Sequence, residues 1–261
     1  MSTATRPAVP QQDSEKTFER LLEEGEQRVG RSGWGQVATG LLGGLDVGTG
    51  VLALLLVEHQ THNPLLAGLA FSIGFIALSL AKSELFTENF LVPVTAVVAG
   101  KVSLRALLQM WAVSLVTNLA GGWVVTGLVI AGFPQLKQTA VEAASFYIAL
   151  GVSWKAVALA LLGGFVITLM THMQHSTESD GTKLVPSVAM GFLLGAGKLN
   201  HAVVASLVTF AALHAGAPFG YLDWLSLLAL AVPVNMAGGL GLVTVLRLLQ
   251  VPHKVADERS S

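Results

Sequence analysis

Six long apolar stretches constrain this chain more than any other feature of its sequence. A helix needs about 20 apolar residues to cross the hydrocarbon core of a bilayer, and backbone in lipid must satisfy its own hydrogen bonds. Only 12% of the 261 residues are charged, too few to keep a soluble surface hydrated. We therefore expect an all-α polytopic membrane protein. Its six spanning regions are 36–57, 65–99, 106–131, 150–173, 184–214 and 222–250.

The second and fifth regions are too long for one span, and polar residues interrupt each near its centre. Lys82–Asn89 breaks the second region and Gly195–His201 breaks the fifth. Two interrupted segments at corresponding places in two halves are typical of a transporter with a site near the middle of the membrane. The alternative is that each polar stretch is an ordinary loop, which would require several spans of only about 10–17 residues.

Short strings also repeat between the two halves. Leu41–Gly44 reads Leu-Leu-Gly-Gly, as does Leu161–Gly164, and the offset is 120 residues. Asn118 and Asn235, 117 residues apart, are each followed by two glycines after two intervening residues. These matches predict a three-plus-three duplication. Because three helices is an odd number, the second half must be inverted, which gives an aquaporin-like arrangement with broken second and fifth helices.

The distribution of lysine and arginine predicts the orientation. Residues 1–33 form a polar arm with a short amphipathic helix at 15–22, residues 34–250 form the transmembrane domain, and 251–261 form a tail. The arm, the tail and the connections on the same side carry most of the basic residues, and cytoplasmic segments are enriched in them. We therefore expect both termini in the cytoplasm.

The composition excludes several other classes of function. A net charge of −1 leaves no basic surface for nucleic acid. The absence of cysteine excludes disulfides, thiolate metal sites and cysteine nucleophiles. Neither a metal nor a cofactor is expected, and the partners expected are membrane lipid and a small solute.

Ionisable residues inside apolar regions are costly and usually face a cavity or a partner. Glu84 and Glu88 are expected to pair with Lys82, either as a structural clamp on the break or in transport. The side chains of Thr87 and Asn89 are expected to satisfy backbone groups that unwinding frees at residues 85–88. The remaining candidates of this kind are Lys155, Lys198 and His201.

His201 is the sharpest functional signal in the sequence. Its side chain titrates near neutral pH, so it can exchange a proton with a passing weak acid. The alternative is a buried histidine that bonds a carbonyl group. The apolar residues Leu85, Phe86 and Leu199 are expected to form a constriction beside it, where an anion must be neutralised or solvated.

These motifs together resemble those of the formate/nitrite transporter family. Glu84–Asn89 resembles that family's Glu-Leu-Phe-Thr-x-Asn signature, which forms the loop in its broken second helix. Lys198–His201 resembles its fifth-helix break, and Asn118 and Asn235 resemble its third- and sixth-helix Asn-x-x-Gly patterns. The resemblance covers roughly residues 35–250.

The resemblance implies six helices per protomer and a homopentamer with one pore per protomer, in the bacterial inner (plasma) membrane. Members of the family pass formate, nitrite, hydrosulfide or lactate-sized acids, in some cases with a proton. The resemblance makes His201 the pore histidine, with Thr87 beside it and Asn235 as its hydrogen-bond partner. Asn118, Asn200 and Lys155 are placed along the same path.

The chain departs from the family pattern at three places. Asn200 replaces the glutamate before the histidine. Leu159 stands where the fourth helix carries a basic residue, and Lys155 lies one turn earlier. The pair Gly164-Phe165 replaces an Asn-Trp pair. These departures indicate a divergent branch and bear on the substrate more than on the fold.

The sequence leaves two other classes of function open. One is a membrane scaffold or sensor that transports nothing. The other is an intramembrane metal-dependent enzyme that uses His172, His175 and Glu178, whose spacing suits metal ligands on a helix. That stretch is better interpreted as a solvated loop, and the chain has no His-Glu-x-x-His motif.

Overall fold

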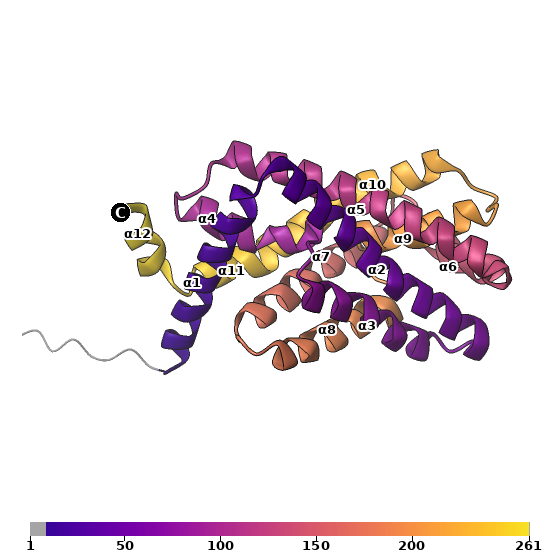
Figure 1. Cartoon of the computed structure of the whole chain (residues 1–261), viewed down its shortest axis with the longest axis horizontal. Coiled ribbons are helices and arrows are strands. Elements are labelled where there is room, and N and C mark those ends of the chain that lie inside the picture. Colours follow the sequence, from indigo (N-terminus) through magenta and orange to yellow (C-terminus); the bar gives the residue numbers. More distant parts are fainter. Residues whose placement is uncertain (1–8, 261) are drawn as a thin grey trace, which may run out of the picture.

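A computed structural model describes residues 9–260, and all the regular structure in that range is helical (Figure 1). The first half contains the N-terminal helix, two long helices, a broken segment and a third long helix. Its elements are α1 (Val9–Gly30), α2 (Gly33–Thr61), α3 (Pro64–Ala81), the 3-10 turn η1 (Phe86–Phe90), α4 (Val92–Val98) and α5 (Leu104–Gly132).

The second half repeats this order of elements. Its elements are η2 (Pro134–Leu136), α6 (Lys137–Leu150), α7 (Trp154–His175), α8 (Asp180–Ala196), α9 (Ala202–His214), α10 (Tyr221–Met236), the π-helix η3 (Ala237–Thr244), α11 (Val245–Leu248) and α12 (Pro252–Ser260). The sequence did not predict α6, because its residues were assigned to a connection between spans.

Five helical stretches in the described part of the chain are long and apolar enough to cross a bilayer. The two breaks expected from the sequence are present. The first divides α3 from a short apolar stretch, Phe86–Val98, and the second divides α8 from α9. The five stretches are α2, α3, α5, α7 and the continuous run Tyr221–Leu248.

Each break begins at a lysine with left-handed backbone. Lys82 directly follows α3 with φ 55°, and Lys198 follows α8 after one intervening residue, Gly197, with φ 46°. This conformation normally favours glycine, because a Cβ atom approaches the following carbonyl oxygen. The two residues are 116 positions apart, close to the offset of the repeated strings. The part of each broken helix that precedes its break, α3 in the first half and α8 in the second, is therefore followed by the same backbone conformation.

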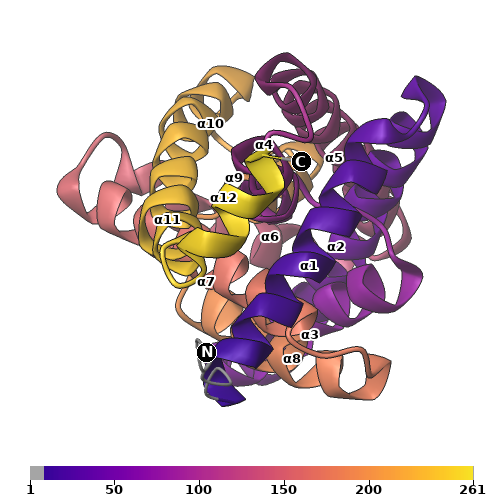
Figure 2. The same ribbon diagram turned by 90° about the vertical axis from the view of Figure 1, so that its left-hand side faces the viewer.

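The N- and C-terminal helices lie together at one end of the molecule (Figure 2). Phe18 and Leu22 of α1 are buried with Ala96, Ala99 and Val251. Lys254 Nζ donates to Glu19 Oε1 over 2.7 Å, and His253 lies 3.0 Å from Glu15. Helix α1 includes residues 15–22, where the sequence predicts an amphipathic helix, but it is longer and packs on the bundle.

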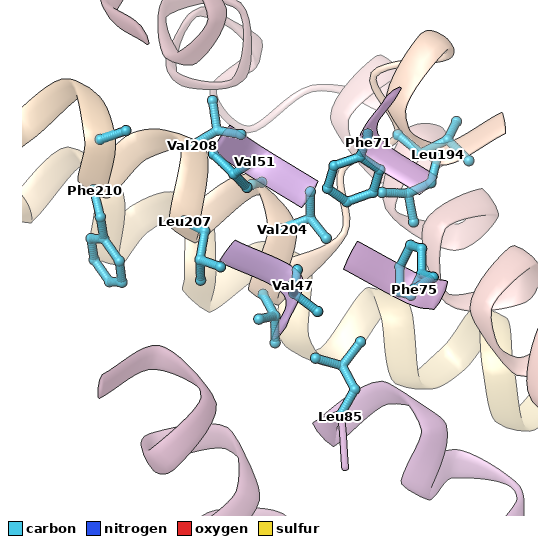
Figure 3. Close-up of a cluster of buried hydrophobic side chains, with 14 of the residues drawn as sticks. Val47, Val51, Phe71, Phe75, Leu85, Leu194, Val204, Leu207, Val208 and Phe210 are labelled. Carbon is cyan, nitrogen blue, oxygen red and sulfur yellow. The ribbon is translucent and has the colours of Figure 1, made fainter. Parts of the chain in front are cut away.

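The main core is formed where α2, α3, α8 and α9 meet (Figure 3). Val47, Phe71, Phe75, Leu194 and Val204 are all almost fully buried there. The rings of Phe71 and Phe75 make an edge-to-face contact with centroids 5.5 Å apart. This packing fixes the ends of the broken helices, from which the polar break residues project.

Candidate functional site

Asn118 of α5 holds the first break in place. Its Nδ2 atom donates to the carbonyl oxygens of Gly40 and Glu84, over 2.7 and 2.9 Å. Its Oδ1 atom accepts from the backbone N–H of Phe86 over 2.7 Å. A buried side-chain amide therefore satisfies backbone groups that the unwound segment would otherwise leave unpaired.

Asn235 of α10 makes the same set of hydrogen bonds at the second break. Its Nδ2 atom donates to the carbonyl oxygens of Ala160 and Asn200, over 2.7 and 3.0 Å. Its Oδ1 atom accepts from the backbone N–H of Ala202 over 2.7 Å. Asn235, expected as a hydrogen-bond partner of His201, bonds instead to the backbone of Asn200 and Ala202, on either side of the histidine, and of Ala160 in α7.

Asn118 and Asn235 act as clamps on the two breaks, and glycine is required where these clamps contact the neighbouring helices. A Cβ atom on Gly44 would collide with the carbonyl oxygen of Asn118, and one on Gly164 would collide with that of Asn235. Close approach through glycine is common between helices in membranes. The repeated Leu-Leu-Gly-Gly strings therefore mark the positions at which α2 and α7 approach the two asparagines.

His201 and Thr87 join the two breaks directly. His201 Nε2 lies 2.7 Å from Thr87 Oγ1, and both residues are 0% exposed. His201 also caps α9, because its Nδ1 atom accepts from the backbone N–H of Val204 over 3.1 Å. Since Nδ1 acts as an acceptor, Nε2 carries the ring proton and donates it to Thr87. The hydroxyl hydrogen of Thr87 then remains available as a donor.

Apolar side chains flank this pair along both breaks. Leu85 and Phe86 precede Thr87 and are 0% and 2% exposed, and Leu199 precedes His201 by two residues and is 8% exposed. The candidate constriction residues from the sequence are therefore buried in the segments that contain the hydrogen-bonded pair.

Arginines of α1 neutralise the carboxylates of the first break. Arg28 is buried, and its guanidinium lies 3.5 Å from Glu84 and 3.9 Å from Glu88. Arg31 also forms an ion pair with Glu84. The expectation that Lys82 pairs with these glutamates was wrong, because Lys82 is exposed and the arginines of the N-terminal helix take that role.

The expected role of Asn89 was also wrong. Its Oδ1 atom accepts from Arg28 over 3.0 Å rather than satisfying freed backbone. The backbone of the first break is satisfied from elsewhere. Trp111 Nε1 donates to the carbonyl oxygen of Asn89 over 2.8 Å, and Thr244 Oγ1 donates to that of Phe90 over 2.7 Å. Thr87 bonds His201 instead of local backbone.

Glu24 extends the ionic cluster along α1. Burial would raise the pKa of this carboxyl group, but the charges and hydrogen bonds of Arg28 and His175 outweigh burial and hold the pKa well below its usual range. Burial would likewise lower the pKa of Arg28, but Glu24, Glu84 and Glu88 outweigh it and raise the pKa. Both groups are therefore held in their charged forms at neutral pH. A cavity of about 460 Å³ lies beside this cluster, between α1 and the ends of α3 and α7.

Lys155 and Lys198 both lie beside the ring of Phe146 in α6. Lys155, in the first turn of α7, is exposed, and its Nζ atom lies 5.5 Å from the centre of the Phe146 ring. Lys198 Nζ lies 5.4 Å from the same ring. Lys198 also lines a cavity of about 180 Å³ together with Glu142 of α6. Lys155 is thus outside the two breaks, whereas Lys198 belongs to the second break, three residues before His201.

Two of the residues considered as metal ligands, His175 and Glu178, have other partners. His175 Nδ1 lies 2.7 Å from the carbonyl oxygen of Thr171, and Nε2 lies 2.9 Å from Glu24 Oε2. Glu178 accepts from Arg20 over 2.7 Å. Between residues 9 and 260, no three histidine or carboxylate side chains are grouped as metal ligands would be.

Comparison with known proteins decides the family. The family model described as "Formate/nitrite transporter" matches residues 15–249. The chain belongs to the formate/nitrite transporter family. It is therefore a member of a family of transporters and channels, and not an enzyme.

Individual members of the family are distant in sequence. The chain is 23% identical over 259 residues to the inner membrane protein YfdC of Escherichia coli K12, and the match covers 93% of this chain and 80% of that one. It is 25% identical over 248 residues to the formate channel BtFdhC of Bacillus thuringiensis, covering 88% and 92%.

Solved structures share the fold. A pentameric formate channel with formate bound aligns with a TM-score of 0.69 and 20% identity, covering 83% of this chain and 96% of that one. An FNT family ion channel aligns with a TM-score of 0.80 and 17% identity, covering 91% and 100%. The all-helical membrane channel architecture expected from the sequence is thus the observed one.

Proposed function

We propose that this chain forms a channel-like pathway for small monovalent anions or their weak acids, of the formate and nitrite class. The observation that carries the proposal is the hydrogen bond between His201 and Thr87. It joins the two broken helices at a fully buried point. The formate channels among its relatives and structural neighbours agree with this class of solute.

The chemistry of the pair suits such a solute. A carboxylate stripped of water in a dry constriction would cost tens of kcal/mol by Born estimates, unless it is protonated or hydrogen-bonded. With Nε2 of His201 donating to Thr87, the Thr87 hydroxyl hydrogen can donate to an oxygen of the solute. A donor that itself accepts a hydrogen bond is polarised and donates more strongly. Leu85, Phe86 and Leu199 then exclude bulk water around it.

Six crossings arranged as two inverted repeats are the topology we propose. The matching hydrogen bonds of Asn118 and Asn235 support the repeats. The proximity of α1 and α12 at one end supports an even number of crossings. We assign that end to the cytoplasm, with residues 1–33 as the arm, 34–250 as the membrane domain and 251–261 as the tail. A C-terminal reporter that is active only outside the cytoplasm would contradict this assignment.

We also propose a homopentamer in the bacterial inner membrane, with one pathway in each protomer and with lipid around the outer helices. One structural neighbour is a pentameric formate channel, and one relative is an inner membrane protein. Native mass spectrometry of the protein in detergent tests the assembly. A stable monomer or dimer under those conditions would contradict it.

Formate flux into vesicles tests the proposed function. The purified protein is reconstituted into liposomes and formate uptake is followed by stopped flow, with protein-free liposomes as the background. Thr87→Val keeps the shape of the side chain but removes the hydroxyl group, so we expect roughly a tenfold loss of flux, as for one hydrogen bond of about 1.4 kcal/mol. Thr126→Val is the matched control, because Thr126 is also buried but bonds only backbone of its own helix. Equal flux in the two variants would show that the first break does not line the pathway.

Proton linkage through His201 is a narrower proposal. A second ring proton would have to sit on Nδ1, which accepts from Val204, so protonation would break the cap of α9. We expect flux to rise as the pH falls, His201→Phe to flatten this dependence and Asn200→Glu to move it to higher pH. Coincident pH profiles from about pH 5 to 8 for the three proteins, corrected for protein amount, would exclude His201 as the titrating group.

A further inference from the structure

Asn200 combines a fully paired backbone with an unpartnered side chain. Its N–H donates to the carbonyl oxygen of Leu159 over 3.2 Å, and its own carbonyl oxygen accepts from Asn235 over 3.0 Å. The side-chain Oδ1 and Nδ2 atoms are both buried and have no hydrogen-bond partner among the described residues. A buried amide in this condition costs free energy unless something else bonds to it.

The corresponding residue of the first break is Glu84. Its backbone makes the same contacts, because its N–H donates to the carbonyl oxygen of Thr39 over 3.4 Å and its carbonyl oxygen accepts from Asn118. The Glu84 side chain is paired with Arg28 and Arg31 of α1. The two breaks thus present equivalent side chains. Partners within the chain occupy the first, whereas the second keeps one donor and one acceptor group unused.

One neighbour of Asn200 in the sequence is a neutral histidine, and another is a lysine that lines a cavity. The adjacent His201 carries a single ring proton, because its Nδ1 atom accepts from Val204. Lys198, two residues earlier, lines the cavity of about 180 Å³. Two residues span at most about 7 Å, so the backbone of Asn200 lies close to this cavity.

The amide of Asn200 matches one protonation state of a small acid. An undissociated carboxylic acid has a hydroxyl donor and a carbonyl acceptor on one edge, which complement the Oδ1 acceptor and the Nδ2–H donor of an asparagine. A carboxylate has acceptors only and would leave Oδ1 unpaired. Desolvation of the neutral acid is also far less costly than that of its anion.

We propose that the Asn200 amide is a specificity-determining contact, which binds the undissociated form of a small carboxylic acid through a pair of hydrogen bonds. The acid O–H donates to Oδ1, and Nδ2–H donates to the acid carbonyl oxygen. This inference rests on the proposed function and adds to it the protonation state of the solute that the second break recognises.

Two solutes and two variants test the proposal. Formic acid entry is followed at one fixed pH through a fluorescent pH indicator trapped in liposomes, and formamide entry is followed by light scattering. Formamide has the same donor and acceptor edge as formic acid but does not ionise in this range. Asn200→Leu keeps the size of the side chain and removes both polar groups. Asn200→Ser restores one donor and one acceptor in a smaller side chain.

We expect Asn200→Leu to lower the flux of both solutes about tenfold, and Asn200→Ser to lower it less. The thermal unfolding midpoint of Asn200→Leu in detergent should equal or exceed that of the unsubstituted protein, because an unpartnered amide has been replaced by an apolar group of similar size. Unchanged flux of both solutes in Asn200→Leu would overturn the proposal. A fall in its unfolding midpoint together with flux would also overturn it, because the amide would then have a structural role.

The flux through the unsubstituted protein distinguishes failure of this inference from failure of the proposed function on which it rests. If its vesicles pass formic acid no faster than protein-free vesicles, the proposed channel function fails. If they pass formic acid faster and Asn200→Leu does so equally, the channel function stands and the role of Asn200 fails.

Discussion

The two breaks share one backbone design and differ in charge. In each, an asparagine from a neighbouring long helix makes three hydrogen bonds to the unwound chain and the helix beside it, and a left-handed lysine begins the break. The first break carries Glu84 and Glu88, which arginines of α1 neutralise. The second carries neutral Asn200 and His201. The shared contacts are therefore structural, and the differences between the breaks carry the chemistry.

This difference also separates the roles of the two helices that precede α2 and α7. Helix α1 packs on α4 and brings charge to the first break, whereas α6 packs on α9 and brings the aromatic ring of Phe146 close to Lys198. The first break thus has buried ion pairs in addition to its neutral hydrogen bonds, and the second has neutral hydrogen bonds and a lysine–ring contact. Substitutions that act on one type of contact should therefore affect the two breaks unequally.

Removal of the buried Arg28 side chain should have the largest effect on stability. Arg28→Met leaves Glu88 without its ion-pair partner and Glu84 with Arg31 alone, and loss of one member of a buried ion pair costs about 3–5 kcal/mol. We expect a marked fall in the thermal unfolding midpoint in detergent. Arg31→Met is the matched control, because the Arg31 side chain is 35% exposed and solvent screens its pair with Glu84. Equal midpoints for the two variants would show that Arg28 is not the main partner.

Replacement of either clamp asparagine should have the next largest effect on stability, and the loss should be similar at the two breaks. Asn118→Leu and Asn235→Leu each remove three hydrogen bonds and leave buried backbone groups unpaired, at about 1–3 kcal/mol for each such group. We expect similar losses of stability of roughly 2–4 kcal/mol in both, by thermal or denaturant unfolding in detergent. Asn63→Ala, at the exposed N-cap of α3, should cost only about 1 kcal/mol. A large loss in one clamp variant alone would contradict the equivalence of the breaks.

Much of this arrangement was predictable from the sequence. Polar residues within a long apolar run can only be an unwound segment or a loop, so both breaks could be located by length and polarity. The repeated asparagine and glycine strings identified the clamps, although not the atoms that they contact. The resemblance to the family placed Thr87 beside His201, and the two side chains are hydrogen-bonded.

The contacts of α1 could not be predicted in the same way. An amphipathic helix outside the spans has a polar face that is usually solvated, so nothing in the sequence marked Arg28 as buried. Its burial follows from the packing of α1 on α4, where a Cβ atom on Gly25 would lie 3.0 Å from the Ala96 side chain. The unpartnered amide of Asn200 was also beyond prediction, because hydrogen-bond satisfaction depends on every neighbour in three dimensions.

The ionic cluster also predicts a response to pH. The pKa of Glu24 is depressed in the folded protein, so its stabilising contribution is present above the ordinary carboxyl value of about 4.5 and is lost as the pH falls below it. We expect the unfolding midpoints of the unsubstituted protein and Glu24→Gln to converge as the pH falls from about 4.5 to about 3. Glu26→Gln, at an exposed position of the same helix, should show no such convergence. A constant difference for Glu24→Gln would contradict the ion-pair assignment.

The smallest expected effect concerns the lysines that begin the breaks. A left-handed backbone costs an L-residue roughly 1–2 kcal/mol, and glycine adopts it freely but loses about 0.5–1 kcal/mol in conformational entropy on folding. Lys82→Gly should therefore stabilise the protein slightly, by less than about 1 kcal/mol. Lys198→Gly should gain less, because it also removes the contact with Phe146, and such a cation–π contact is worth about 0.5–1 kcal/mol or more. Lys183→Gly, in the ordinary helical turn of α8, should lose about 1 kcal/mol and serves as the control. Precise unfolding midpoints measured side by side rank the three variants. An equal gain in Lys82→Gly and Lys198→Gly would show that the contact of Lys198 with Phe146, which has no counterpart at Lys82 within residues 9–260, does not contribute to stability.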